Sequence, residues 1–291
     1  MGVDGIFRGA SDGCLSMFTI GSDIEFAVLL RGKPMSAEHV IRGTKHEPIR
    51  LPGGYLLSHD NVLAEVATPV AMDEDDFVSV VGQSLRMLGE ACAGMELSGE
   101  AAVEFDDASL NTPTAMEFGC DPDYDIWDLM ENEPPIAIGN KWRSCGGHVH
   151  VGGRGAFKTQ DGVVNLGRWM DAILGSTMTS LYDNTGERIR RRLYGRSGCV
   201  RQKPYGVEYR TLSNAWPQTE ASTRAVYRLT ADSVLAMESG IRIEWFVDKD
   251  LLRNAINNAD SRMASELSDA LMAAGIISNN SYEMVKECRS M

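Results

Sequence analysis

The 291-residue sequence predicts an α+β fold built on a largely antiparallel sheet. Segments with strand-like patterns do not alternate regularly with helical ones, which argues against a parallel, doubly wound sheet. Most neighbouring strands are separated by short, turn-like links that are typical of hairpins. Hydrophobic residues make up 43% of the chain, enough to bury a substantial core.

The strands are read from apolar and β-branched runs that end at turn residues. A first strand is expected over residues 17–30, interrupted at Gly21 and followed by a turn. A hairpin should then join residues 54–58 to residues 62–70 through the turn sequence His-Asp-Asn. Further strands are expected at residues 95–105, 113–119, 144–152 and 205–213.

The helices are read from apolar residues at helical spacing and from capping residues. The first should begin near Asp73, which can cap it, and the acidic residues 74–76 suit its positive N-terminal end. Residues 120–141 and an arginine-rich stretch before residue 205 have loop-like sequences. The other helices are expected at residues 161–183, 218–239, 248–257, 261–274 and 278–289.

The bulk properties of the chain exclude several classes of protein. A formal net charge of −13 argues against a general affinity for nucleic acid or for anionic membranes. No apolar run is long enough for a membrane helix or a signal peptide. The six cysteines are scattered without a CxxC pair, which disfavours a disulfide framework or a zinc knot. We therefore expect a cytoplasmic protein with free thiols.

Three short segments place chemically active side chains at i and i+2 of a strand, where they share a face. They are Asp23-Ile24-Glu25, His148-Val149-His150 and Glu208-Tyr209-Arg210. A further carboxylate, Glu65, interrupts an apolar strand. Neighbouring carboxylates repel one another unless a cation lies between them. If the segments share one sheet face, they predict a Mg²⁺ site, or a Mn²⁺ site if a histidine is a ligand.

Each of these segments also has a structural interpretation. Asp23 and Glu25 fit the wet face of an antiparallel strand. The two histidines fit a structural pair, although glycines at 146–147 and 152–153 would allow a ligand or backbone to approach closely. Glu208 and Arg210 fit a cross-strand ion pair. The sequence alone leaves these alternatives open.

A basic cluster stands out in this acidic chain. Arginine forks bind phosphate in a bidentate manner, and several together can neutralise a triphosphate. Glycines at 195 and 198 indicate a shaped loop, whereas a solvated surface or pairing with the protein's own acids is the alternative. A P-loop is excluded because no GxxxxGK[ST] motif is present, and nucleic-acid contact is the less favoured interpretation. The cluster consists of Arg188, Arg190, Arg191, Arg192, Arg196, Arg201 and Lys203.

Four motifs occur in an order that resembles a known group of enzymes. They are Gly21-Ser-Asp-Ile-Glu25, Leu63-Ala-Glu-Val-Ala-Thr-Pro69, Gly146-Gly-His-Val-His-Val151 and Tyr205-Gly-Val-Glu-Tyr-Arg210. The chain, over residues 17–216, resembles the carboxylate–amine (COOH–NH2) ligases of phages, which are related to glutamate–cysteine ligase and more remotely to glutamine synthetase. This resemblance implies a curved, largely antiparallel sheet that forms a funnel, with helices packed on its outer face.

The resemblance also implies an activity and a domain arrangement. It implies an ATP-dependent ligase that forms an amide or peptide bond through an acyl phosphate, in the host cytoplasm if phage-encoded. Residues 16–247 would be the catalytic domain, residues 248–291 would be helices packed on it, and residues 1–15 would be flexible. The implied partners are small-molecule or peptide carboxylates and amines. Residues 120–141 are a candidate for a loop that covers the intermediate.

The predicted site combines the motifs with the basic cluster. The first motif carries Asp where such ligases commonly have Glu, and the sequence identifies neither the two substrates nor the oligomeric state. A small-molecule phosphotransferase and a non-catalytic metal- or ligand-binding protein are the alternatives. The expected cofactors are ATP and Mg²⁺, with Mn²⁺ as a second candidate ion. We assign Asp23, Glu25, Glu65, His148 and Glu208 to metal, Arg188, Arg191, Arg201 and His150 to ATP, and Arg210, Glu208 and Arg196 to the chemistry.

Overall fold

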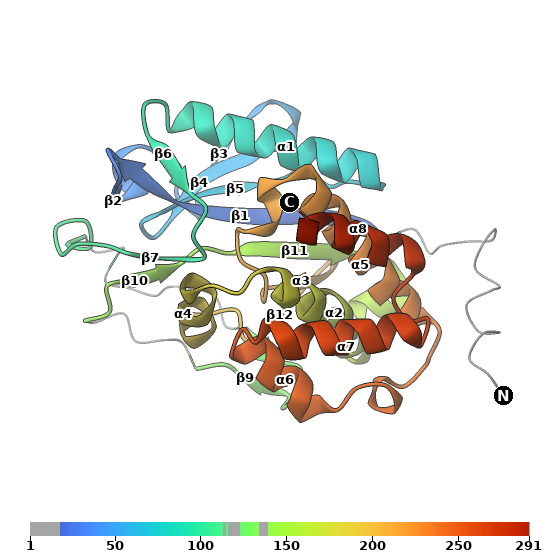
Figure 1. Ribbon diagram of the computed structural model, residues 1–291. Helices are drawn as coiled ribbons and strands as arrows, with labels where there is room; N and C mark the ends of the chain where they lie inside the picture. Colours follow the sequence, from blue (N-terminus) through green and yellow to red (C-terminus); the bar gives the residue numbers. More distant parts are fainter. Residues whose placement is uncertain (1–17, 113–114, 116–122, 134–138, 291) are drawn as a thin grey trace.

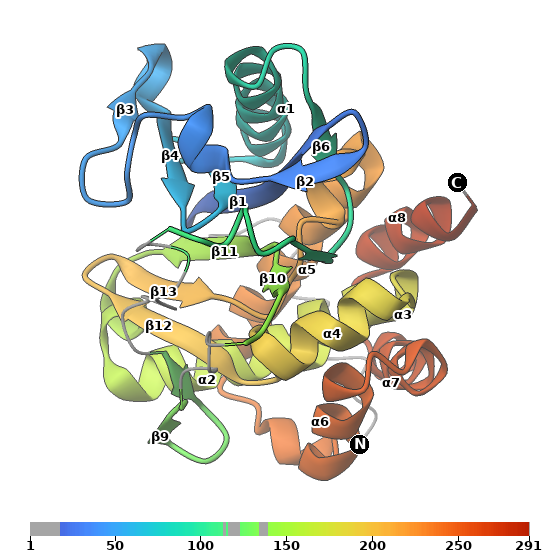
Figure 2. The same ribbon diagram turned by 90° about the vertical axis from the view of Figure 1, so that its left-hand side faces the viewer.

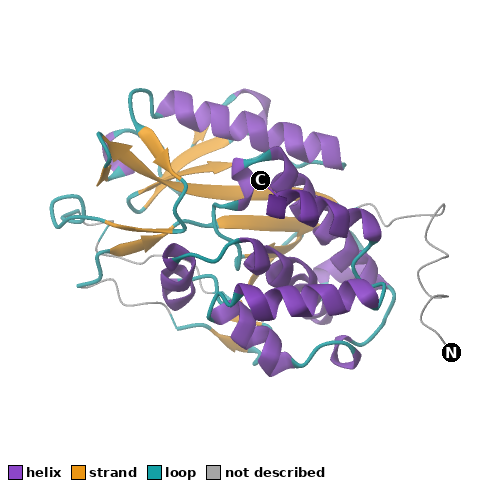
Figure 3. Cartoon of the chain, viewed as in Figure 1, coloured by secondary structure: helices purple, strands orange, loops and turns teal. Residues whose placement is uncertain are grey.

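The computed structural model describes residues 18–112, 115, 123–133 and 139–290. These residues form one large antiparallel sheet, a separate two-stranded sheet and a set of helices (Figure 1). Figure 3 shows the strands with one helix above them and most of the other helices at the lower right. The predicted α+β class with a largely antiparallel sheet is confirmed, and the described strands form no closed barrel.

The strands are short apart from the first, which is the longest in the sheet. They are β1 (Thr19–Leu30), β2 (Lys33–Met35), β3 (Ile49–Arg50), β4 (Leu56–Asp60), β5 (Leu63–Ala67), β6 (Glu96–Ser98), β7 (Ala102–Glu104), β8 (Tyr124–Asp125), β9 (Met130–Glu131), β10 (Trp142–Ser144), β11 (Gly147–Gly152), β12 (Cys199–Lys203) and β13 (Gly206–Tyr209).

The helices gather in the second half of the chain, and a π-helical turn, Asp171–Gly175, joins two of them. They are α1 (Glu74–Ala91), α2 (Gln160–Met170), α3 (Ser176–Leu181), α4 (Thr185–Leu193), α5 (Glu220–Glu238), α6 (Lys249–Asn257), α7 (Ser261–Ala273) and α8 (Asn279–Ser290). No helix among these is both long and apolar enough to cross a lipid bilayer.

Strand β1 is the centre of the large sheet. It pairs with β5 on one edge and with β11 on the other, and its C-terminal end also pairs with β2 and β6. The main path of the sheet is β3-β4-β5-β1-β11-β13-β12-β8-β9, and all of these pairs are antiparallel (Figure 2). Segments far apart in the sequence therefore lie side by side along β1.

One face of the sheet is apolar and carries the core. Ile24, Val66, Val149 and Val207 are fully buried there. Helix α1 packs on β1 and β5, α2 packs on β12 and β13, and α5 packs on both helices. Because side chains alternate along each strand, the neighbouring residues point to the opposite face, which is polar.

The C-terminal helices join the same core. Helix α7 packs on α3 and α6, and α8 packs on α5. Leu252, Ile256, Leu271 and Val285 belong to the same buried cluster as the residues of the sheet. The predicted flexible segment at residues 1–15 lies outside the described residues.

Most predicted elements are present, with shifted ends. Asp73 caps α1 as expected, and its side chain accepts from the Asp76 backbone N–H at 2.8 Å. The predicted interruption at Gly21 is wrong, because β1 runs unbroken between two partner strands. The predicted strands 95–105 and 144–152 are each two strands, and the one at 113–119 falls almost wholly outside the described residues.

The prediction of an arginine-rich loop is wrong for residues 185–193, which form α4. Asn184 caps this helix by accepting from the Glu187 backbone N–H at 2.9 Å. Glu187 and Arg191 are one helical turn apart and form an ion pair at 3.4 Å. Arginine and leucine favour helices, so capping and composition together outweigh the neighbouring glycines.

A buried carboxylate connects three segments behind the sheet. Asp171, in the π-helical turn, accepts from Trp127 Nε1 at 2.7 Å, from Ser197 Oγ at 2.6 Å and from Tyr209 OH at 2.7 Å. Gly175 permits the close approach of Tyr209, because a Cβ atom at this position would lie 2.3 Å from the tyrosine hydroxyl. Asp171 therefore ties the β8–β9 hairpin and the segment before β12 to β13.

Replacement of Asp171 should destabilise the protein. Asp171→Ala leaves three buried donors without their acceptor, so we expect the free energy of unfolding to fall by about 2–4 kcal/mol. Asp161→Ala, at the exposed start of α2, is the control and should change it by about 0.3–1 kcal/mol. Chemical denaturation measures both, and a loss under about 1 kcal/mol for Asp171→Ala would contradict this role.

Candidate functional site

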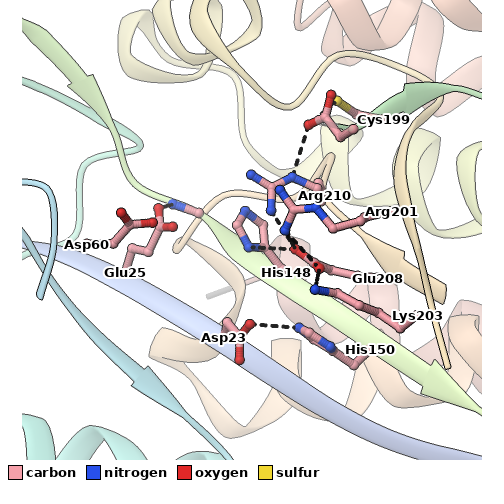
Figure 4. A network of polar contacts seen from close by, with 12 residues as sticks. Asp23, Glu25, Asp60, His148, His150, Cys199, Arg201, Lys203, Glu208 and Arg210 are labelled. Atoms are coloured by element: carbon pink, nitrogen blue, oxygen red, sulfur yellow. Dashed lines mark hydrogen bonds and ion pairs between the residues drawn. The ribbon is translucent and has the colours of Figure 1, made fainter. Parts of the chain in front are cut away.

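The register of the sheet brings the three predicted pairs together on its polar face. Asp23 of β1 lies opposite His148 of β11, and His150 of β11 lies opposite Glu208 of β13. Directly opposed residues of an antiparallel pair point to the same side of the sheet. Figure 4 shows these side chains gathered over β1, β11 and β13.

Three carboxylates form a first group, which we call the acidic group. Glu25 of β1 lies opposite Glu65 of β5, and Asp60 at the end of β4 completes the group. One oxygen from each residue lies within 4.8 Å of the others. Gly146 donates its backbone N–H to Glu25 Oε2 at 2.6 Å. In contrast, Glu65 Oε2 is buried and has no hydrogen-bond partner among the described residues.

The acidic group is electrostatically unbalanced. Burial raises the pKa of Glu65 well above its usual range, and the charges of Asp23, Asp60 and Glu25 raise it further. Burial and Asp60 also raise the pKa of Glu25, against an opposing effect of Arg190. A divalent cation with oxygen ligands would remove this repulsion and satisfy the unpartnered oxygen, so the group fits such an ion.

A second group, the histidine group, consists of Asp23, His150 and Glu208, again with ligand atoms within 4.8 Å of one another. His150 Nε2 lies 3.0 Å from Asp23 Oδ2, and His150 Nδ1 is hydrogen-bonded to the Tyr205 hydroxyl. Burial alone would raise the pKa of Asp23 and lower that of His150. Their ion pair has the opposite effect and prevails, so the pKa of Asp23 is lowered and that of His150 is raised. This group offers nitrogen as well as oxygen ligands.

His148 lies between the two groups in the sheet but belongs to neither. It is buried, and its Nδ1 is 3.8 Å from Glu208 Oε1. Burial lowers its pKa well below the usual range, and Arg210 lowers it further. The lowered pKa favours the neutral imidazole, which is the form that binds metals.

Three cations converge on Glu208. Arg201 NH1 lies 3.0 Å from Glu208 Oε1, Arg210 NH1 lies 2.5 Å from the same oxygen, and Lys203 Nζ lies 3.0 Å from Oε2. Burial alone would raise the pKa of Glu208, but the positive charges of Arg210 and Arg201 hold it well below its usual range. The cations of β12 and Arg210, which directly follows β13, are therefore gathered beside the histidine group (Figure 4).

The arginines of residues 188–196 lie differently from Arg201 and Arg210. Arg188 pairs with Asp183 on the exposed side of the helix and contacts neither group. Arg191 NH1 donates to the carbonyls of Gly195 and Thr211, and Arg196 Nε donates to the Arg191 carbonyl at 3.3 Å. These contacts shape the chain around β13, and phosphate binding by these three residues stays a prediction.

A cavity opens beside the acidic group. Its wall includes two members of that group, a histidine and three arginines, so both signs of charge face the same space. The lining residues are Glu25, Asp60, Asn61, Leu63, Arg143, Ser144, His148, Arg190, Tyr194 and Arg210.

Sequence reasoning missed two acidic residues of the site. Asp60 lies in the predicted turn, and only a strand extended two residues beyond Ser58 would have placed it on the polar face. Asp123, in the predicted loop 120–141, accepts from Arg210 Nε at 3.1 Å. No local sequence signal connects it with β13, 87 residues away.

The raised pKa of Glu65 makes a prediction about stability. A carboxyl group whose pKa is raised by folding opposes folding once the pH exceeds about 4.3, its value in the unfolded chain. Glu65→Gln should therefore melt at a higher temperature than the wild type in EDTA at about pH 8. The difference should shrink as the pH is lowered towards 5.

The exposed carboxylate Glu96 provides the matched control, since Glu96→Gln should show no such pH-dependent difference. Thermal melts at several pH values measure both variants. A Glu65→Gln variant that gains no stability at high pH would show that the acidic group is not repulsive.

Comparison with known proteins identifies a family over the second half of the chain. Residues 140–288 match the family described as phage phiEco32-like COOH.NH2 ligase-type 2. This segment contains His148, His150, Glu208 and Arg210, whereas the strands that carry the acidic group precede it. No curated protein matches the chain.

Among solved structures, the chain is similar to a bifunctional glutathione synthetase from Pasteurella multocida, with 11% sequence identity and a TM-score of 0.45. The similarity covers 94% of this chain and 46% of that protein, so the chain spans less than half of its length. The family match covers just over half of the present chain, and the protein therefore belongs to the phage phiEco32-like COOH.NH2 ligase-type 2 family.

Proposed function

We propose that the protein is an ATP-dependent ligase that joins a carboxylate to an amine through an acyl-phosphate intermediate. One observation carries the proposal: two groups of metal-ligand type lie on one sheet face beside three converging cations. The family supports the carboxylate–amine reaction. ATP is the part that the proposal adds.

The chemistry explains why ATP is needed. A carboxylate does not react with an amine at neutral pH, because oxide is a poor leaving group. Transfer of the γ-phosphoryl group of ATP to a carboxylate oxygen gives an acyl phosphate and ADP. The amine nitrogen then attacks the acyl carbon, the carbon–oxygen bond to phosphate breaks, and the nitrogen loses a proton. The first step depends mainly on positioning and on neutralisation of charge.

The acidic group and the histidine group would hold the metal ions. Glu25, Asp60 and Glu65 offer only oxygen ligands, which suits Mg²⁺. Asp23, His150 and Glu208 add an imidazole, which makes Mn²⁺ equally suitable. Ions held by these residues would supply positive charge that offsets the negative charge of the triphosphate.

The converging cations would bind the phosphoryl oxygens. Arg201 and Arg210 present guanidinium forks, and Lys203 adds a point charge, all within reach of Glu208. Their placement on adjacent strands fixes them before the ligand arrives. Such preorganised charge stabilises a transition state without reorganisation during the reaction.

The cavity beside the acidic group is the proposed place of the carboxylate substrate. Arg190 lines it, is fully buried, and has an Nε atom without a hydrogen-bond partner among the described residues. Arg210 lines the same cavity and also contacts Glu208. A carboxylate here would be compensated by guanidinium groups and would lie near the proposed phosphate site.

The proposal predicts a reaction that requires three substrates. The protein, incubated with ATP, Mg²⁺ and a panel of carboxylates and amines, should release ADP and phosphate together with an amide. Chromatography with mass spectrometry identifies the products. A stable phosphorylated product without any need for an amine would instead indicate a phosphotransferase. Absence of nucleotide binding with both Mg²⁺ and Mn²⁺ would contradict the proposal and favour a non-catalytic binding protein.

Glu25→Gln is the informative variant for this assay. It removes one charge from the acidic group, so turnover should fall by about 100-fold or more. Its melting temperature should change little, because relief of repulsion offsets the weaker hydrogen bond with Gly146. Glu96→Gln, at an exposed position, should retain full activity.

A further inference from the structure

We propose that Asp123 is a positioning residue of this ligase: it fixes the Arg210 guanidinium independently of Glu208. This inference rests on the proposed function, because Arg210 matters as a ligand of the phosphoryl group. Asp123 lies outside residues 140–288, which match the family, and outside the four sequence motifs. Three features of the geometry support this role of Asp123.

The first feature is that two carboxylates hold Arg210 at different nitrogens. Arg210 Nε donates to Asp123 Oδ2 at 3.1 Å, while NH1 donates to Glu208 Oε1 at 2.5 Å. Asp123, Glu208 and Arg210 are all buried. A planar guanidinium that is held at Nε and at one terminal nitrogen has a fixed orientation. The carboxylates of Asp123 and Glu208 therefore both determine how the Arg210 guanidinium faces the cavity.

The second feature is that Glu208 has competing partners. Its two oxygens also accept from Arg201 and Lys203, and Glu208 belongs to the histidine group. A cation bound to that group would draw on the same oxygens. Glu208 is therefore a shared anchor for Arg210, whereas Arg210 is the one ion-pair partner of Asp123 among the described residues.

The third feature is that Asp123 is itself held in place. Asn132 Nδ2 donates to Asp123 Oδ1 at 2.9 Å, and the Asn132 backbone N–H donates to the Asp123 carbonyl at the same distance. Cys199 Sγ donates to Asp123 Oδ2 at 3.3 Å. A carboxylate supported on both oxygens can orient a partner, as second-layer groups do at other catalytic sites.

The hairpin that carries Asp123 is docked elsewhere as well, and this supplies a control. Asp128, at the hairpin turn, pairs with Lys249 and with Arg253 of α6, each at 2.7 Å. Asp128 contacts neither Arg210 nor the histidine group. Asp128→Asn should loosen the hairpin from α6 without removing an anchor of Arg210.

The first arm of the test observes the contact directly. In the wild type, the Arg210 Nε–H should give a separate ¹H–¹⁵N signal that exchanges slowly with water, and Arg210→Lys assigns it. Asp123→Ala should shift this signal and speed its exchange by at least about tenfold, whereas Asp128→Asn should leave it unchanged. An unchanged Nε–H signal in Asp123→Ala would overturn the inference.

The second arm measures function with the same variants. Asp123→Asn and Asp123→Ala should lower kcat by about 10- to 100-fold with a smaller change in the KM for ATP. Asp123→Asn keeps an oxygen acceptor and should retain more activity than Asp123→Ala. Asp128→Asn should stay within about threefold of the wild type. Equal losses in all three variants would show a general effect of the hairpin and would overturn the inference.

The two proposals fail in distinguishable ways. If the proposed function is wrong, the wild type itself consumes no ATP, whatever the Asp123 variants do. If only the inference is wrong, the wild type is active and the Asp123 variants match Asp128→Asn in both arms. Melting curves of all variants, recorded alongside, identify any loss of the folded structure.

Discussion

Strand β1 pairs with β5 on one side and with β11 on the other, and the site depends on this pairing. It places Glu25 opposite Glu65 and Asp23 opposite His148. The next pairing outward, between β11 and β13, adds Glu208 opposite His150. A slip of one residue in either register would turn these side chains into the apolar core, so burial of the opposite face fixes the site.

The polar face is divided electrostatically between its two groups. At the histidine group, Arg201, Lys203 and Arg210 balance the carboxylates and hold the pKa of Glu208 low. At the acidic group, burial and mutual repulsion raise the pKa values of Glu25 and Glu65. In the folded protein, nearby cations thus offset the negative charge of the histidine group, whereas the carboxylates of the acidic group repel one another.

Much of the fold could be predicted from local sequence. The apolar run of β1, the cap at Asp73 and the helical spacing after residue 218 each indicate the correct element, because each is set by neighbouring residues. The glycines at 195 and 198 indicate a loop for the arginine-rich stretch, whereas residues 185–193 form α4, which Asn184 caps. The π-helical turn at Asp171 has no local signature and follows from packing against Tyr209.

The site was predictable where its residues share a strand, and not where they come from separate segments. The i, i+2 pairs needed only the alternation of side chains, but their meeting on one face depended on register, which is a long-range property. Asp60 and Asp123 reach the site from a strand end and a hairpin that the sequence marks as turn and loop. Their roles come from partners far along the chain, such as Glu25 and Arg210.

The most direct test of the central claim is a crystal structure with Mn²⁺ and a non-hydrolysable ATP analogue. Manganese can be located by its anomalous scattering, independently of how the side chains are built. The account predicts Mn²⁺ at the acidic group and at the histidine group, with the γ-phosphate against Arg201, Lys203 and Arg210. An analogue bound away from this face, with no manganese among Glu25, Asp60 and Glu65, would contradict it.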